Sequence, residues 1–219
     1  VPADKVRKLI DAKKDMQAFP LPAAKKLPVP PRPAEPPLPK LTDPFDESVV
    51  KSINKAIEFL WSQQNQDGSW PGYTMPGIGG FPAGPTALAR YALLESGASV
   101  KEKRMGRALK WLAREDTDKR TYTTALKCGG WMAAVRENAD SDYAKYLTKD
   151  AEKLIRAGKD GSYSYDTDSK GHMGDNSNSQ YGVLGVWAGV QADEEVPREY
   201  WYKVLKHWTE CQTGEGGWG

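Results

Sequence analysis

Residues 55–70, KAIEFLWSQQNQDGSW, combine an apolar helical pattern with a polar ending that contains a glutamine, a glycine and a tryptophan. Residues 203–218, KVLKHWTECQTGEGGW, follow the same order. The shared positions lie 148 residues apart in each case: Gln64 and Gln212, Gly68 and Gly216, and Trp70 and Trp218. Such long matches at one spacing indicate an internal repeat, in which one helical unit recurs along the chain.

Two weaker copies lie between these matches. Residues 108–115, ALKWLARE, keep the helical part without the Gln and Trp, and residues 151–163, AEKLIRAGKDGSY, keep the Asp-Gly-Ser-aromatic ending. The aligned positions are separated by 52, 43 and 53 residues: Leu60, Leu112, Ile155 and Trp208. These spacings match the length of two helices with their connections, so the repeated unit is predicted to be a helical hairpin.

The second helix of each hairpin is predicted between the copies, at residues 84–97, Thr121–Glu137 and 177–190. In the first of them, Pro85 suits the first helical turn and Gly97 suits the C-terminal cap. All three segments are rich in Ala and Gly, and Gly182, Gly185 and Gly189 fall on one face of the third. These glycines either leave room for a cavity or allow close helix packing, and close packing is the better explanation.

The pattern in residues 55–70 resembles the QW motif of squalene and oxidosqualene cyclases, and residues 50–219 resemble the prenyltransferase/squalene oxidase repeat family. The copy at residues 203–218 departs from the pattern with His207, where an aromatic residue or leucine is usual. The resemblance implies an all-α fold of the terpenoid cyclase and protein prenyltransferase type, an α/α toroid in which inner and outer helices alternate. About three and a half hairpins of an incomplete ring would then follow a Pro-rich extension.

The glutamine, glycine and tryptophan of the motif have a structural explanation. A Gln at a helix end can bond backbone groups that have no partner within the helix, and a Trp can cover the sharp turn that Gly permits. We therefore expect six residues to act as structural clamps: Gln64, Gly68, Trp70, Gln212, Gly216 and Trp218.

The catalytic residues of the related enzymes are not matched. The cyclases protonate an alkene with an Asp-x-Asp-Asp cluster, and of that pattern only Asp175 is present, with Ser177 in place of the proton-donating aspartate. The zinc-dependent prenyltransferases use Asp, Cys and His, but Cys128, Cys211 and the two histidines do not have that family's spacing. We therefore predict no catalytic residue, metal site or cofactor in this chain.

Residues 174–189, GDNSNSQYGVLGVWAG, place a polar head directly before an apolar inner helix. One or two of its six polar side chains are explained by helix capping. The others, facing the same mouth as Tyr122, suggest a polar rim over an apolar pocket. The candidate ligand-facing residues are Asp175, Asn176, Asn178, Gln180, Tyr181, Tyr122 and Trp187.

These features support a noncatalytic module that binds an apolar or extended ligand, such as an isoprenoid or a glycan, or a protein partner through its inner-helix face. The alternative is a squalene/terpenoid cyclase-class enzyme whose catalytic acid lies outside this chain. A third interpretation is an interaction scaffold without a pocket. A partner chain or further residues would complete the toroid in each case.

Composition divides the chain into a basic, Pro-rich extension (1–45) and the repeat domain (46–219). Residues 1–45 carry nine Lys or Arg against five Asp or Glu, whereas residues 46–219 carry twenty-two against twenty-four. A nearly neutral domain without a basic stripe is not expected to bind nucleic acid. No apolar run reaches the eighteen residues that indicate a transmembrane helix. The chain begins at Val1, so an exported or periplasmic location follows only if a signal sequence was removed before it.

Overall fold

The structure is a computed structural model that describes residues 44–75, 79–138, 142–169 and 174–218. This part of the chain contains seven α-helices and one short two-stranded hairpin. The elements in chain order are α2 (Pro44–Ser62), β1 (Tyr73–Met75), β2 (Gly79–Phe81), α3 (Gly84–Glu95), α4 (Lys103–Arg114), α5 (Thr121–Glu137), α6 (Tyr143–Ala157), α7 (Asn176–Val190) and α8 (Arg198–Glu210). The predicted all-α class is therefore confirmed.

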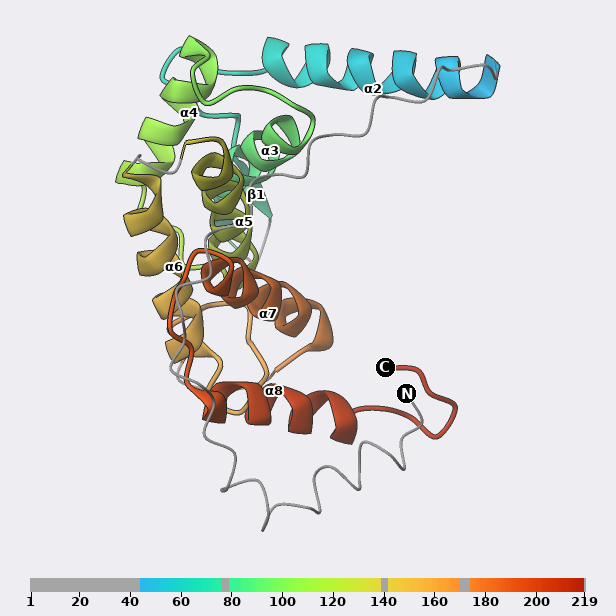
Figure 1. Ribbon diagram of the computed structural model, residues 1–219, viewed down its shortest axis with the longest axis vertical. Coiled ribbons are helices and arrows are strands. Elements are labelled where there is room, and N and C mark those ends of the chain that lie inside the picture. The colour runs from blue at the N-terminus through green and yellow to red at the C-terminus, as the bar shows by residue number, and fades with distance from the viewer. Residues whose placement is uncertain (1–43, 76–78, 139–141, 170–173, 219) are drawn as a thin grey trace.

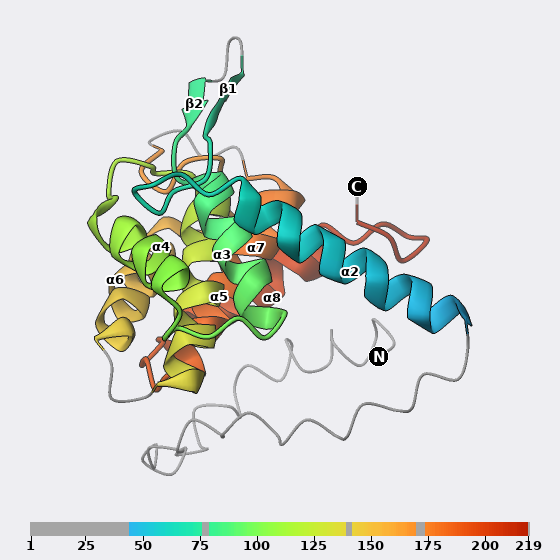
Figure 2. The same ribbon diagram turned by 90° about the horizontal axis from the view of Figure 1, so that it is seen from above.

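The helices α3, α5 and α7 form a row, and α4 and α6 lie along one side of it (Figure 1). Helix α5 is central, because it packs against α3, α6 and α7. Helices α2 and α8 extend from the two ends of the row (Figure 1). The β1–β2 hairpin, which lies between α2 and α3 in the sequence, projects away from the helices (Figure 2). We call α3, α5 and α7 the inner row, following the hairpin order of the sequence.

The helix boundaries follow the local sequence signals closely. Helix α5 spans the predicted Thr121–Glu137, and α7 begins one residue before its predicted start. Helix α3 ends at Glu95, and Gly97 then adopts a φ of 95°. The Gly97 N–H donates to the Leu94 carbonyl and the Ala98 N–H donates to the Leu93 carbonyl, which is the Schellman arrangement that glycine favours.

One boundary differs from expectation. Helix α2 begins at Pro44, inside the segment assigned from its prolines to the extension (1–45). Proline is accepted in the first helical turn, where its missing N–H would have no partner within the helix, so a helix can start there. The remainder of the predicted basic, Pro-rich extension, before Pro44, lies outside the described residues.

Close packing explains the glycines of α7. A Cβ added at Gly182 would lie 2.6 Å from the Tyr163 ring, and one at Gly185 would lie 2.4 Å from Leu154. At Gly189 the added Cβ would meet the Ala151 methyl at 2.8 Å. The packing interpretation of these three glycines is therefore supported, because each position is filled by a neighbouring side chain.

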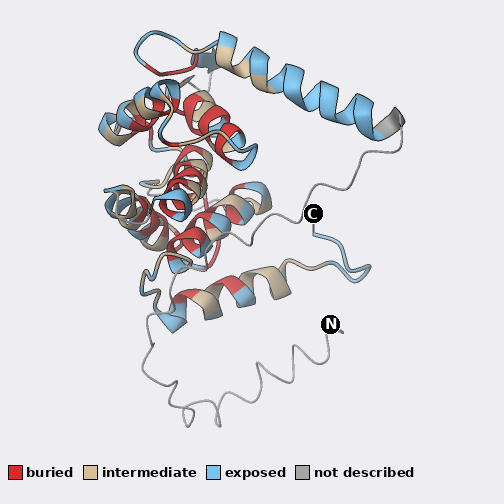
Figure 3. Ribbon diagram, turned by 45° about the horizontal axis from the view of Figure 1, so that its top comes forward, coloured by how far each residue is buried: buried red, intermediate tan, exposed pale blue. Residues whose placement is uncertain are grey.

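The burial pattern differs between the ends and the middle of the molecule. The inner row and α4 and α6 bury one face of each helix, whereas most of α2 is exposed (Figure 3). The largest fully buried side chains include Trp131, Tyr163, Leu109 and Leu154, which come from the centre of the chain. The centre therefore holds the core, and the end helices have large uncovered surfaces.

Candidate functional site

Asp175 caps the helix α7 whose first turns carry the predicted polar rim. Its Oδ1 accepts hydrogen bonds from the Asn178 backbone N–H at 2.7 Å and from Ser177 Oγ at 2.6 Å. Its Oδ2 accepts a third from Asn178 Nδ2 at 2.7 Å. Partial burial alone would raise the pKa of the Asp175 carboxyl, but the hydrogen bonds from Ser177 and Asn178 outweigh it and lower that pKa. Asp175 is thus held as an ionised acceptor.

Two polar residues of the same segment point inward. Asn178 is fully buried and its amide nitrogen is bonded to Asp175, so this predicted ligand-facing residue supports the cap and not the rim. Ser179 is also fully buried, and its Oγ accepts a hydrogen bond from the Tyr163 backbone N–H at 2.9 Å. The polar excess in the sequence is therefore partly explained by links within the fold.

The predicted aromatic residues of α5 and α7 do come together. The rings of Tyr122 and Tyr181 lie 4.4 Å apart between centroids, at 48° to each other. On α7, Gln180 is exposed and Trp187 is half exposed, while Asn176 contacts His207 of α8. The structure therefore places Tyr122, Tyr181, Gln180 and Trp187 at the surface of the inner row.

This surface extends to α3 through a contact that the sequence did not predict. A Cβ added at Gly129 of α5 would lie 3.0 Å from the Tyr91 ring of α3. Gly129 and Tyr122 are seven residues apart and so lie on the same face of α5. Tyr91 and Tyr181 therefore flank one partly buried face of α5. We use the name inner-helix face for the surface formed by Leu88, Tyr91, Tyr122, Tyr181, Leu184 and Trp187.

The inner-helix face exposes large apolar side chains. Leu88, Leu184 and Trp187 are 54%, 51% and 50% exposed. Leu184 and Trp187 are one turn apart on α7, so they form a continuous strip beside the Tyr122–Tyr181 pair. A hollow of about 280 Å³ lies instead between the C-terminal ends of α3 and α5, where Leu94 and Ala133 contribute to its lining. That hollow is away from the predicted rim at the N-terminal end of α7.

The two glutamines of the QW-like stretches make the same hydrogen bond. Gln64 Nε2 donates to the Gly68 carbonyl at 3.1 Å, and Gln212 Nε2 donates to the Gly216 carbonyl at 3.0 Å. Both glycines have left-handed backbones, with φ of 99° at Gly68 and 87° at Gly216. Each glutamine therefore closes a sharp turn that only glycine adopts without strain.

The two tryptophans also have equivalent partners. Trp70 Nε1 donates to the Leu60 carbonyl at 2.7 Å, and Trp218 Nε1 donates to the Trp208 carbonyl at 2.8 Å. Both carbonyls belong to the helix just before the turn, so each indole satisfies a group near a helix end. Their environments differ, because Trp70 is 4% exposed and Trp218 is 51% exposed. The same local unit is therefore covered at one end of the molecule and open at the other.

Among the described residues, the Gly68 turn makes a contact with another helix that the Gly216 turn does not make. Gln64 Nε2 also donates to the Arg104 carbonyl of α4 at 3.0 Å. Gln212 Nε2 donates within its own turn, to the Gly216 carbonyl. The first glutamine therefore joins α2 to α4, in addition to closing its turn.

We expect Gln64→Ala to lower the free energy of unfolding by about 1–2 kcal/mol, because it removes the two hydrogen bonds that Gln64 Nε2 donates and the one, at 3.4 Å, that Gln64 Oε1 accepts from Arg107 Nη2. Gln212→Ala is the matched control and should cost less, about 0.5–1 kcal/mol, because one exposed bond is lost. Urea unfolding of both variants measures the difference. Equal losses would contradict the linking role of Gln64.

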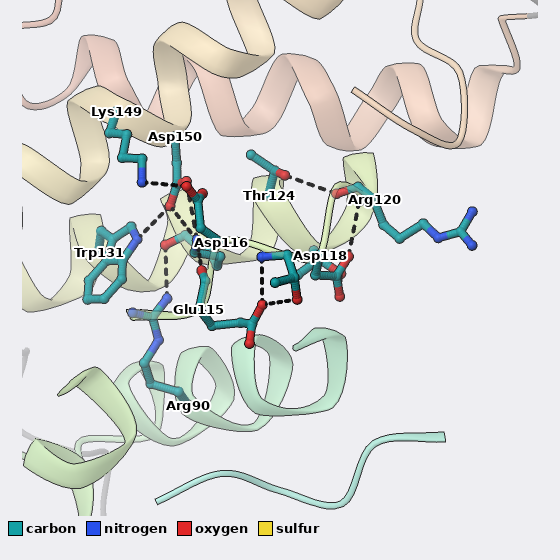
Figure 4. A network of polar contacts seen from close by, with 12 residues as sticks. Arg90, Glu115, Asp116, Asp118, Arg120, Thr124, Trp131, Lys149 and Asp150 are labelled. Atoms are coloured by element: carbon teal, nitrogen blue, oxygen red, sulfur yellow. Dashed lines mark hydrogen bonds and ion pairs between the residues drawn. The ribbon is translucent and has the colours of Figure 1, made fainter. Parts of the chain in front are cut away.

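A buried ionic cluster lies between α3, α5 and α6 (Figure 4). Lys127 Nζ lies 3.3 Å from Asp150, and Trp131 Nε1 donates to Asp150 Oδ2 at 2.9 Å. The Arg90 guanidinium stacks on the Trp131 ring at 4.2 Å and donates to the Lys127 carbonyl at 2.9 Å. Desolvation lowers the pKa of Arg90 to about 9, against the attraction of Asp150. The sequence did not predict this cluster; the residue that makes room for it is Gly130, where an added Cβ would lie 2.2 Å from Arg90 Nη2.

Comparison with known proteins finds no family model that matches the chain and no curated protein that is significantly similar to it. Within the described ranges, no three or more His, Cys, Asp and Glu side chains gather as a metal site. None of the helices in the same ranges has both the length and the apolar character needed to cross a membrane.

Proposed function

We propose that the chain is a noncatalytic module of α/α-toroid type, related to the prenyltransferase/squalene oxidase repeats, that binds an apolar, extended ligand on its inner-helix face. The repeat part of this proposal is supported by the matching hydrogen bonds of the Gln64 and Gln212 turns. It is also supported by the way in which two turns, the Gly68 turn and the Gly161 turn, each lie against a later helix. The Gly68 turn lies against Arg107 of α4, and the Gly161 turn lies against Lys203 of α8.

The binding part depends on one observation, the exposed apolar strip of the inner-helix face. Leu184 and Trp187 are each about half exposed next to the Tyr122 and Tyr181 rings, which contact each other at a tilt of 48°. Contiguous exposed apolar side chains of this kind mark ligand or partner surfaces in proteins. Four aromatic or aliphatic side chains in a strip suit a long hydrocarbon, such as an isoprenoid, better than a compact polar molecule.

The cyclase alternative requires a proton donor from outside these residues. Asp175 is the one residue that matches the cyclase acid cluster, and its oxygens accept three hydrogen bonds that favour the charged form. A carboxylate held in this way accepts protons poorly and donates none at neutral pH. The geometry therefore favours binding over alkene protonation by this chain.

We expect the chain to bind a C20 isoprenoid alcohol, and Trp187→Ala to weaken that binding about tenfold, because a large aromatic contact is lost. Tyr202→Ala is the matched control, since Tyr202 is 46% exposed on α8 outside the inner-helix face. Equilibrium dialysis with the labelled alcohol measures both. An oligosaccharide arm tests the glycan alternative. Equal binding by the two variants, or binding of neither ligand, would refute the proposed site.

A further inference from the structure

A thiol, an imidazole and an amide lie in a line between α8 and the start of α7. Cys211 Sγ is 3.6 Å from His207 Nδ1, and His207 Nε2 is 3.1 Å from Asn176 Oδ1. His207 and Cys211 are one helical turn apart at the C-terminal end of α8, and Asn176 is the first residue of α7. Two helices that are adjacent in sequence but joined by a loop thus bring the three groups together.

The amide oxygen determines which nitrogen of the imidazole carries the proton. An amide oxygen accepts hydrogen bonds and cannot donate one, so His207 Nε2 is the donor to Asn176. In the neutral ring Nδ1 is then the acceptor, and its lone pair faces the Cys211 thiol. The ring is also held edge-on against Trp208, with 5.4 Å between centroids and 74° between planes. A base oriented by a third group next to a thiol is the arrangement of nucleophilic cysteines.

The other cysteine provides an internal contrast. Cys128 is fully buried in α5, and desolvation raises the pKa of its thiol well above the ordinary value. A thiol of that kind is chemically inert in the folded protein. Cys211 is half-buried and has the His207 base at 3.6 Å. The two cysteines are therefore expected to differ in reactivity.

We infer that Cys211 is a nucleophilic thiol, with His207 as its general base and Asn176 as a positioning residue, and that it adds to neutral α,β-unsaturated carbonyl compounds. The sulfur forms a bond to the β-carbon as the carbon–carbon π bond breaks. The thiol proton passes to His207 Nδ1 and then to the α-carbon of the resulting enolate. The addition consumes no oxidant or other reactant.

The site suits conjugate addition better than acyl transfer. Conjugate addition requires a base and a proton donor, and one imidazole supplies both in succession. Acyl transfer must in addition expel a leaving group and then release the acyl group from the sulfur, whereas conjugate addition has no leaving group. Cys211, His207 and Asn176 together supply a nucleophile and a route for its proton. Conjugate addition is the reaction that needs these two functions and no leaving group.

The test uses the full 219-residue chain and N-ethylmaleimide, an α,β-unsaturated imide, with peptide mapping of the modified cysteine at pH 7. We expect modification at Cys211 and protection of Cys128 until the protein is unfolded. A positioned general base contributes about 100- to 10,000-fold, so His207→Gln should slow the modification of Cys211 at least about tenfold. Equal rates in the parent chain and His207→Gln would overturn the inference.

Asn176 has its own pair of variants. Asn176→Leu removes the acceptor for Nε2 and should slow modification severalfold, whereas Asn176→Asp keeps an acceptor oxygen and should restore the rate. A purely structural role would not distinguish these two variants, provided that thermal unfolding shows both to be folded. A rate unchanged by Asn176→Leu would overturn the positioning role.

Discussion

Replacing Asp150 with asparagine should lower the free energy of unfolding by about 3–5 kcal/mol, because it removes the negative charge from a buried ionic cluster. Asp150 is 2% exposed and lies 3.3 Å from Lys127 Nζ. It also attracts Arg90, which is fully buried and whose pKa is already lowered to about 9 by desolvation. Asparagine can keep an acceptor for Trp131, so the expected loss comes from two buried cations without a counter-charge.

Asp116→Asn is the matched control for this prediction. Its carboxylate pairs with Lys149 at 3.0 Å, but both side chains are more than half exposed. An exposed pair contributes about 0–1 kcal/mol, so this variant should unfold close to the parent chain. Guanidinium unfolding at pH 7 measures both variants. A loss below about 1 kcal/mol for Asp150→Asn would show that water or relaxation compensates the buried charges.

The helical framework was predictable because the repeated stretches leave helix-length segments between them. Helix α5 matches the predicted Thr121–Glu137, a segment rich in Ala and Gly that ends at polar residues. The β1–β2 hairpin was not predicted, because two strands of three residues are too short to show a period. Sequence patterns therefore predicted the helices but not the β1–β2 hairpin, whose two short strands pair only with each other.

The candidate site was predictable where the position of a residue along its helix determines whether its side chain reaches the surface. Tyr122 and Tyr181 were expected at one mouth, and the structure brings their rings to 4.4 Å. Asn178 was expected at the rim but is buried, because its side-chain amide donates a hydrogen bond to Asp175, the residue that caps α7. The His207–Asn176 contact joins residues 31 apart in sequence, and no local pattern indicates such a pairing.

Gly68→Ala should lower the free energy of unfolding by about 3 kcal/mol or more. The left-handed backbone at Gly68, with φ of 99°, costs a non-glycine residue about 1–2 kcal/mol. The added Cβ would also lie 2.5 Å from the carbonyl carbon and 2.6 Å from the carbonyl oxygen of Arg107 in α4. These are backbone atoms that cannot rotate away, so overpacking adds about 1–3 kcal/mol.

Gly216→Ala separates these two contributions, since the Gly216 turn has the same backbone and the same glutamine bond. Its φ is 87°, but the nearest atom to an added Cβ is the Gln212 amide nitrogen at 4.0 Å. We therefore expect a loss of only about 1–2 kcal/mol, the left-handed backbone alone. Thermal and urea unfolding of the two variants give the difference, and equal losses would contradict the role assigned to α4. If a partner helix covers the Gly216 turn as α4 covers the Gly68 turn, Gly216→Ala should become as costly as Gly68→Ala once that partner is bound.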